Sequence, residues 1–302
     1  MNPPLNKRKV YIHKIWYSVI LFVLVLLCVL LYHYSQNYAD LTPDVILNAE
    51  NKRLYVSYLD VGEGDCTLIQ TPQGHSVLID TGLGVMQSRV TGYLAQQNVK
   101  KIDYLILTHL HEDHAGGLEG ILAYLPVENL IVPNLSNQQL EESSVFQLAK
   151  LHDTKLSLCQ KNTRLTLGEA HVDFLHDGAN PENRENVSII LMLEYKMQRF
   201  LFTGDCDTQQ EKQLLGDNFT LDCDVLKVGH HGSESSTSLP FLHSATPELA
   251  VISVGTPNSY GHPAEDTLER LDQFAHTVLR TDVYGNIRIE TDGNQRKIWC
   301  QK

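Results

Sequence analysis

Residues 108–114 constrain the fold of this 302-residue chain more than any other segment. They read Thr-His-Leu-His-Glu-Asp-His and directly follow an apolar run, residues 104–107, that has the pattern of a short buried strand. Four side chains able to bind a metal, His109, His111, Asp113 and His114, therefore leave one strand end together. Such clustering is rare by chance in a chain with 14 histidines. The segment predicts a metal site at the end of a strand.

The spacing of these four side chains favours two metal ions over one. On a turn that leaves a strand, His109 and His111 can point to one ion, and Asp113 and His114 to a second. Imidazole nitrogens and carboxylate oxygens suit zinc, manganese and iron, so we expect two divalent ions, Zn²⁺ or Mn²⁺. Two ions about 4 Å apart hold the attacking and departing oxygens of a displacement and lower the pKa of a shared water.

Three further segments place polar side chains after apolar runs. Residues 202–205 end in Gly-Asp, and Asp205 on such a turn can bridge two metal ions. Residues 227–233 continue a strand into a loop that carries His230 and His231, and residues 258–263 form a polar turn that contains His262. Each segment alone is a weak signal, and the last could be merely structural. Their recurrence at strand ends predicts one site on one rim of a sheet.

The periodicity of the chain predicts an α/β fold with two strand-rich layers covered by helices. Strands are expected at residues 54–60, 67–71, 76–80, 104–107, 172–175, 187–194, 200–203, 225–228, 249–253, 278–281, 287–290 and 297–299. Helices are expected at residues 85–97, 116–124, 137–150, 207–215 and 264–274.

Together these segments resemble the metallo-β-lactamase superfamily, and more narrowly the extracellular hydrolase domain of ComEC-type DNA-uptake competence proteins. The resemblance rests on residues 59–65 (LDVGEGD), 78–82 (LIDTG), 109–117, 203–205, 228–233 and 260–263, which keep the family's order over about four-fifths of the chain. It implies an αββα sandwich with two metal ions at one rim.

The resemblance also implies roles for individual residues. His109 and His111 would bind the first ion, Asp113 and His114 the second, and Asp205 would bridge them. Either His230 or His231 would complete the second site; we favour His230 because it leaves the strand first. The other implied roles are orientation of a ligand by Asp80, catalysis by Asp113, His231 and His262, and substrate contact by Ser233, Tyr260 and His262. Many superfamily members carry a further His on the loop here formed by residues 181–186, where Asn186 would take a weaker role.

The N-terminal segment predicts a membrane anchor. Residues 15–32 are almost wholly apolar, and eighteen helical residues nearly match the ~30 Å hydrocarbon core. Lys7, Arg8, Lys9 and Lys14 precede them, which predicts a cytoplasmic N-terminus. We expect a cytoplasmic basic tail at 1–14, a transmembrane signal anchor at 15–34, a stalk at 35–52 and an extracellular hydrolase domain at 53–302, single-pass in the plasma membrane. A cleaved signal peptide is the alternative, and the apolar run is long for one.

Net charge restricts the partners of the outer domain. Residues 1–34 hold four of the 24 basic residues and none of the 36 acidic ones, so the remainder carries a net charge of −16. Because nucleic-acid affinity rests on Lys and Arg, this charge disfavours a polyanion in general. The resemblance to ComEC-type proteins nevertheless implies a phosphodiester substrate, with DNA as one candidate. The alternatives are a hydrolase of acyl, lactone or thioester bonds, and a non-catalytic partner of a separate membrane channel.

Overall fold

The computed structural model describes residue 25 and residues 53–180, 187–217 and 219–302. Arg53–Lys302 form one compact unit. Apart from residue 25, the predicted tail, anchor and stalk lie outside the described residues. Within the described part of the chain, no helix is long and apolar enough to cross a membrane. The anchor at 15–34 therefore stays a prediction.

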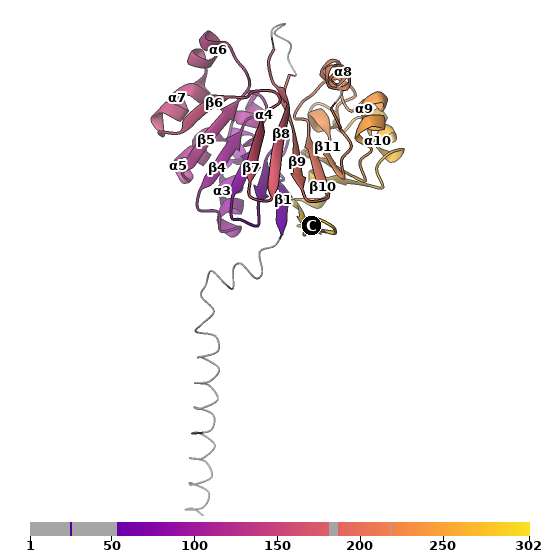
Figure 1. Ribbon diagram of the computed structural model, residues 1–302, viewed down its shortest axis with the longest axis horizontal. Coiled ribbons are helices and arrows are strands. Elements are labelled where there is room, and N and C mark those ends of the chain that lie inside the picture. The colour runs from indigo at the N-terminus through magenta and orange to yellow at the C-terminus, as the bar shows by residue number, and fades with distance from the viewer. Residues whose placement is uncertain (1–24, 26–52, 181–186, 218) are drawn as a thin grey trace, which may run out of the picture. The chain divides into compact units, whose positions relative to one another are not determined.

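Two β-sheets face each other in this unit (Figure 1). The first has the order β15-β14-β1-β2-β3-β4-β5-β6 and the second the order β13-β12-β11-β10-β9-β8-β7. The strands of the first sheet are β1 Leu54–Tyr58, β2 Thr67–Gln70, β3 Ser76–Ile79, β4 Ile102–Ile106, β5 Val127–Val132, β6 Lys155–Leu158, β14 Ile287–Thr291 and β15 Arg296–Cys300. Those of the second are β7 Arg164–Leu167, β8 Ala170–Asp177, β9 Ile189–Tyr195, β10 Gln198–Phe202, β11 Val225–Lys227, β12 Leu249–Ile252 and β13 Thr277–Arg280.

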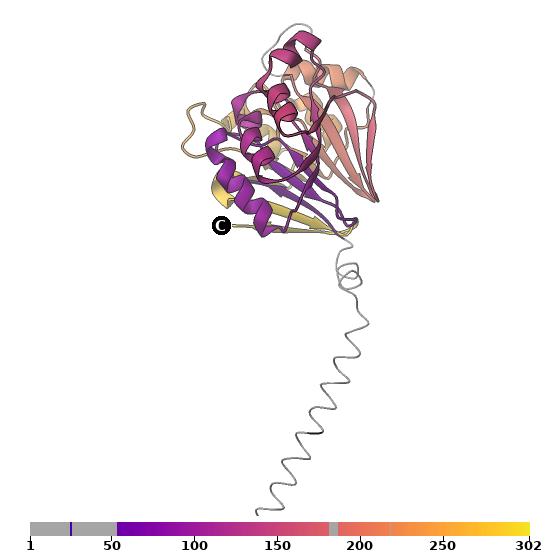
Figure 2. The same ribbon diagram turned by 90° about the vertical axis from the view of Figure 1, so that its left-hand side faces the viewer.

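Helices cover the outer face of each sheet (Figure 2). The first sheet packs against α3 Gln87–Gln96, α5 Leu118–Tyr124 and α7 Ser144–Leu151, and the second against α8 Thr208–Gly216, α9 Leu239–Ala245 and α10 Glu265–Asp272. The shorter helical segments are η1 Gly84–Met86, α4 Glu112–Ala115, α6 Asn137–Glu142, η2 Gly229–Gly232 and α11 Thr281–Tyr284. A third apolar cluster, which includes Tyr58, Phe200 and Phe202, fills the space between the sheets. The predicted αββα sandwich is confirmed.

The prediction of a single helix at 137–150 is wrong, because the helix is interrupted at Ser143. This residue has extended backbone angles (φ −75°, ψ 142°), and its hydroxyl accepts a hydrogen bond from the backbone N–H of Phe146 at 3.2 Å. A serine in this position caps the N-terminus of the following helix, so α6 ends and α7 begins there.

The parallel strands explain why the site lies on one rim. Strands β3, β4 and β5 run parallel in the first sheet, and β10, β11 and β12 run parallel in the second. Asp80, the loop at 107–111, Asp205, the loop at 229–231 and the loop at 253–263 follow the carboxyl ends of five of these strands. The fold thereby brings segments far apart in the chain to one edge.

Candidate metal centre

Two overlapping groups of metal-competent side chains form the centre. One comprises Asp113, His114, Asp205 and His231, and the other His109, His111 and Asp113. Within each group, one ligand atom from every residue lies within 4.8 Å of the others. Asp113 belongs to both. The structure therefore brings together the four side chains of the first motif and those of two later strand ends.

Asp205 lies between these groups. Its Oδ1 lies 3.1 Å from Nε2 of His114, and its Oδ2 lies 3.6 Å from Nε2 of His109. The turn that carries it is tightly packed: the backbone N–H of Asp205 donates to Oγ of Ser188 at 2.9 Å. Gly204 has φ +51°, and a Cβ there would lie 2.7 Å from the same oxygen. A carboxylate so placed can reach an ion in either group.

The donor atoms fit divalent metal ions. Among the described residues, Nε2 of His109, Nε2 of His114 and Oδ1 of Asp205 are buried and lack a hydrogen-bond partner. Buried polar atoms are normally satisfied, so atoms left without partners that converge on one place indicate a ligand. Burial and the neighbouring His114 hold the pKa of His109 well below its usual range. Its imidazole is therefore neutral near pH 7, the form that binds metal.

Carboxylates and histidines in the centre stabilise each other's charged forms. Burial disfavours charge on His114, but Asp205 and Asp80 outweigh it and hold the pKa of His114 well above its usual range. Burial would likewise raise the pKa of Asp113, but the hydrogen bond from His231 and the nearby His114 lower it to about 2. Asp113 is therefore an anion at neutral pH, as a metal ligand must be.

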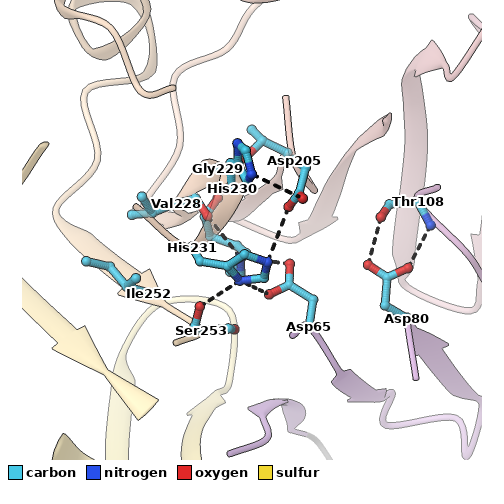
Figure 3. Close-up of polar contacts among 12 residues, drawn as sticks. Asp65, Asp80, Thr108, Asp205, Val228, Gly229, His230, His231, Ile252 and Ser253 are labelled. Atoms are coloured by element: carbon cyan, nitrogen blue, oxygen red, sulfur yellow. Dashed lines mark hydrogen bonds and ion pairs between the residues drawn. The ribbon is translucent and has the colours of Figure 1, made fainter. Parts of the chain in front are cut away.

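Asp80, whose predicted role is to orient a ligand, contacts His114. Its Oδ2 lies 2.8 Å from Nδ1 of His114. The backbone N–H and the hydroxyl of Thr108 donate to its two oxygens at 2.7 and 2.8 Å (Figure 3). Asp80 also has φ +58°, an uncommon backbone conformation for Asp that this network holds in place. With Nδ1 bonded to Asp80, Nε2 of His114 is directed at Asp205.

The geometry favours His231 over His230 as the further histidine of the group that contains Asp113, His114 and Asp205. Nδ1 of His231 lies 2.9 Å from the backbone oxygen of Ser253 (Figure 3). Nε2 of His231 lies 3.2 Å from Oδ2 of Asp113. When the single proton of a neutral His231 lies on Nδ1 and donates to the backbone oxygen of Ser253, Nε2 is available to bind metal in place of its hydrogen bond to Asp113. His230 belongs to neither group, and its Nε2 lies 3.8 Å from Asp205. The sequence preference for His230 is not supported.

We expect His231→Ala to reduce the bound metal from two ions per chain to one, and His230→Ala to retain both. The reason is that His231, unlike His230, directs a nitrogen at both Asp113 and Asp205. The metal content of each variant after dialysis, measured by inductively coupled plasma mass spectrometry, checks this prediction. Loss of an ion in His230→Ala but not in His231→Ala would reverse the assignment.

A buried ion pair that the sequence analysis missed supports both metal groups. Nζ of Lys227 lies 2.8 Å from Oδ2 of Asp65, with side-chain exposures of 3% and 6%. Oδ1 of Asp65 lies 3.6 Å from Nδ1 of His231. The backbone N–H of Asp65 donates to the backbone oxygen of Asp113 at 3.1 Å. Gly64 is needed here, because a Cβ would lie 2.4 Å from that oxygen. The pair therefore helps to hold His231 and Asp113, two of the candidate ligands, in position.

A cavity of about 510 Å³ opens onto the centre. His230, Tyr260 and His262 line it, as do Glu63, Leu83, His111, Glu112, Asp113, Asp205, His231, Val254 and Asn258. Tyr260 and His262 thus lie where their predicted substrate contacts require. Ser233 does not: it is buried, its hydroxyl contacts that of Ser235 at 3.0 Å, and it is not among the described residues that line the cavity. Asn186 lies outside the described residues.

Residues 59–256 match the family model of the metallo-beta-lactamase superfamily. The chain belongs to this superfamily. Its relatives include ComE operon protein 3 of Bacillus subtilis, 30% identical over 77% of this chain and 32% of its own length. They also include Recombination protein 2 of Haemophilus influenzae (32% identical, 78% and 28%) and competence protein ComA of Neisseria gonorrhoeae (31% identical, 78% and 32%). The chain thus spans about a third of the length of these relatives.

Solved structures of the superfamily confirm the fold. The metallo-beta-lactamase fold protein YhfI from Bacillus subtilis aligns with a TM-score of 0.54 at 14% identity, covering 79% of this chain and all of that one. CmlA, a diiron beta-hydroxylase from Streptomyces venezuelae, aligns with the same TM-score at 15% identity, covering 82% of this chain and 54% of its own. Since one of these is named a hydroxylase, the superfamily fold alone does not define the reaction.

Proposed function

We propose that this member of the superfamily is a metal-dependent phosphodiesterase that binds two divalent ions, Zn²⁺ or Mn²⁺. The observation that supports this most is the position of Asp205, with one oxygen near His109 and the other near His114. When bound, two such ions supply Lewis acidity and lower the pKa of the attacking water.

The residues divide into ligands and cavity-lining groups. His109, His111 and Asp205 would hold one ion, and Asp113, His114, His231 and Asp205 the other. His230 and His262 line the cavity beside them. Burial lowers the pKa of both, so each is neutral near pH 7 and offers one N–H donor to a phosphate oxygen. Donors aimed at an oxygen that gains charge during hydrolysis favour the transition state.

The names of the relatives suggest where such an activity would serve. Two of them are called competence and recombination proteins, so we propose a role in DNA uptake, with DNA as a candidate substrate. We also propose that residues 15–34 anchor the chain in the plasma membrane with the domain outside. Labelling of exposed Cys300 by an impermeant thiol reagent on intact cells would support that orientation. Labelling only after lysis would contradict it.

A panel of substrates tests the proposed reaction. The chain, freed of metal and then supplied with Mn²⁺ or Zn²⁺, should hydrolyse methyl p-nitrophenyl phosphate faster than a lactone or a thioester. Preference for the lactone or thioester would move the assignment to acyl hydrolysis. Bound metal without turnover of any substrate would favour a binding role for the domain.

A further inference from the structure

A row of aromatic rings runs from the protein surface to the metal centre. Tyr260 is 75% exposed at the mouth of the cavity, and its ring stacks on His262 with a centroid distance of 5.9 Å and an interplanar angle of 21°. The His262 ring is in turn nearly parallel to that of His231, at 6.4 Å and 24°. One imidazole therefore separates the exposed tyrosine from a candidate metal ligand.

Hydrogen bonds hold the backbone of the loop that carries Tyr260 in place. The backbone N–H of Ser259 donates to Oε1 of Glu63 at 2.8 Å. Nδ2 of Asn258 donates to the backbone oxygen of His262 at 2.6 Å, and the backbone N–H of His262 donates to Oδ1 of Asn258 at 3.0 Å. A surface fixed before binding loses less entropy when a ligand arrives. The backbone on either side of the exposed ring is therefore held before a ligand binds.

The charge of the cavity indicates what the ring does. Four of the residues that line it are carboxylates: Glu63, Glu112, Asp113 and Asp205. Asp113 and Asp205 would be neutralised by the ions that they hold, but Glu63 and Glu112 would still repel a phosphate, so contacts to an uncharged part of the substrate would strengthen binding. An exposed aromatic ring can stack on any nucleobase, and such stacking tolerates different bases because each has a flat face. In a nucleotide, the sugar separates base from phosphate much as His262 separates Tyr260 from His231.

We propose that Tyr260 is the stacking platform for a nucleobase, so that the site selects nucleotide phosphodiesters over phosphodiesters without a base. The base lies on the Tyr260 ring at the cavity mouth, and the phosphodiester lies beside His262 and the metal centre. The reaction in this inference rests on the proposed function, but the binding of a nucleobase to Tyr260 does not. Tyr260 is a specificity residue here, and its ring rather than its hydroxyl makes the contact.

Two esters with the same leaving group test the proposal. For the metal-loaded 302-residue chain, kcat/KM should be about 5- to 150-fold higher for thymidine 5′-(p-nitrophenyl phosphate) than for methyl p-nitrophenyl phosphate. Tyr260→Phe should keep this ratio, because the ring remains, and Tyr260→Ala should bring it close to one. Tyr124→Ala is the matched control: Tyr124 is 48% exposed on α5, away from this cavity, and its loss should leave the ratio unchanged. An equal ratio in Tyr260→Ala and the unaltered chain overturns the proposal, as does loss of the ratio in Tyr260→Phe.

Binding separates this proposal from the proposed function. By calorimetry, thymidine 5′-monophosphate should bind more tightly than deoxyribose 5-phosphate by a similar factor, and Tyr260→Ala should remove the difference. If neither ester is hydrolysed but this difference is found, the phosphodiesterase assignment fails and the nucleobase platform stands. If both esters are hydrolysed and Tyr260 affects neither selectivity nor binding, the phosphodiesterase assignment stands and the nucleobase platform fails.

Discussion

Replacement of Asp205 by Ala is expected to lower kcat/KM for a phosphodiester by on the order of 10³-fold or more. The same change should remove most of the bound metal. Asp205 is 2% exposed, and its two oxygens face His114 and His231 on one side and His109 and His230 on the other. Without it, the group formed by Asp113, His114, Asp205 and His231 loses one of its two carboxylates, and the two groups lose the anion between them.

The Asp205 prediction is checked by metal content and kinetics measured on the same samples. Asp272→Ala is a matched control, because Asp272 is exposed at the end of α10. It should retain both metal and turnover. Circular dichroism should show the same secondary structure in both variants. If Asp205→Ala keeps two ions and stays within tenfold of full activity, Asp205 does not bridge the ions.

The second large effect is expected from loss of the buried ion pair between Lys227 and Asp65. Lys227→Met leaves the Asp65 carboxylate buried without its cation, and breaking a buried pair in this way costs about 3–5 kcal/mol of folding stability. Adding Asp65→Asn removes the unpaired charge, so the double variant should recover much of that loss. Because Asp65 also contacts His231 and the backbone of Asp113, the double variant should still bind metal less tightly than the unaltered chain.

Urea unfolding of the metal-free proteins measures the stability differences, and calorimetric titration with Zn²⁺ measures the binding. A loss below about 1 kcal/mol in Lys227→Met would show that the pair is unimportant for folding. Additive losses in the double variant would show that the two residues are not coupled. Recovered stability with full metal affinity would restrict the pair to a structural role.

The site was predictable from sequence where ligands follow a recognisable strand. The apolar run before His109 and the Gly turn before Asp205 place each ligand at a strand end, and parallel pairing then brings those ends to one rim. The preference between His230 and His231 depends instead on backbone angles. Both have positive φ, 47° and 53°, so order of exit from the strand does not determine which ring turns toward Asp113.

Other features depend on contacts that sequence patterns do not reveal. β6 and β7 alternate polar and apolar residues, but over only four positions each, which is the shortest run that indicates a strand. β5 carries polar residues at two of its six positions, so its apolar pattern is interrupted. Lys227 reads as an ordinary charge near the end of a strand, yet it is buried and pairs with Asp65, which lies on the loop between β1 and β2 of the other sheet. Such a pairing follows only from the packed fold.

Hydrolysis of an aryl phosphodiester by the metal-free chain, titrated with Mn²⁺ or Zn²⁺, tests the central claim most directly. The account predicts no turnover without metal, activity that reaches its maximum at two ions per chain, and none in Asp113→Ala, whose carboxylate belongs to both metal groups. Turnover that persists without metal, or that Asp113→Ala retains, would contradict it.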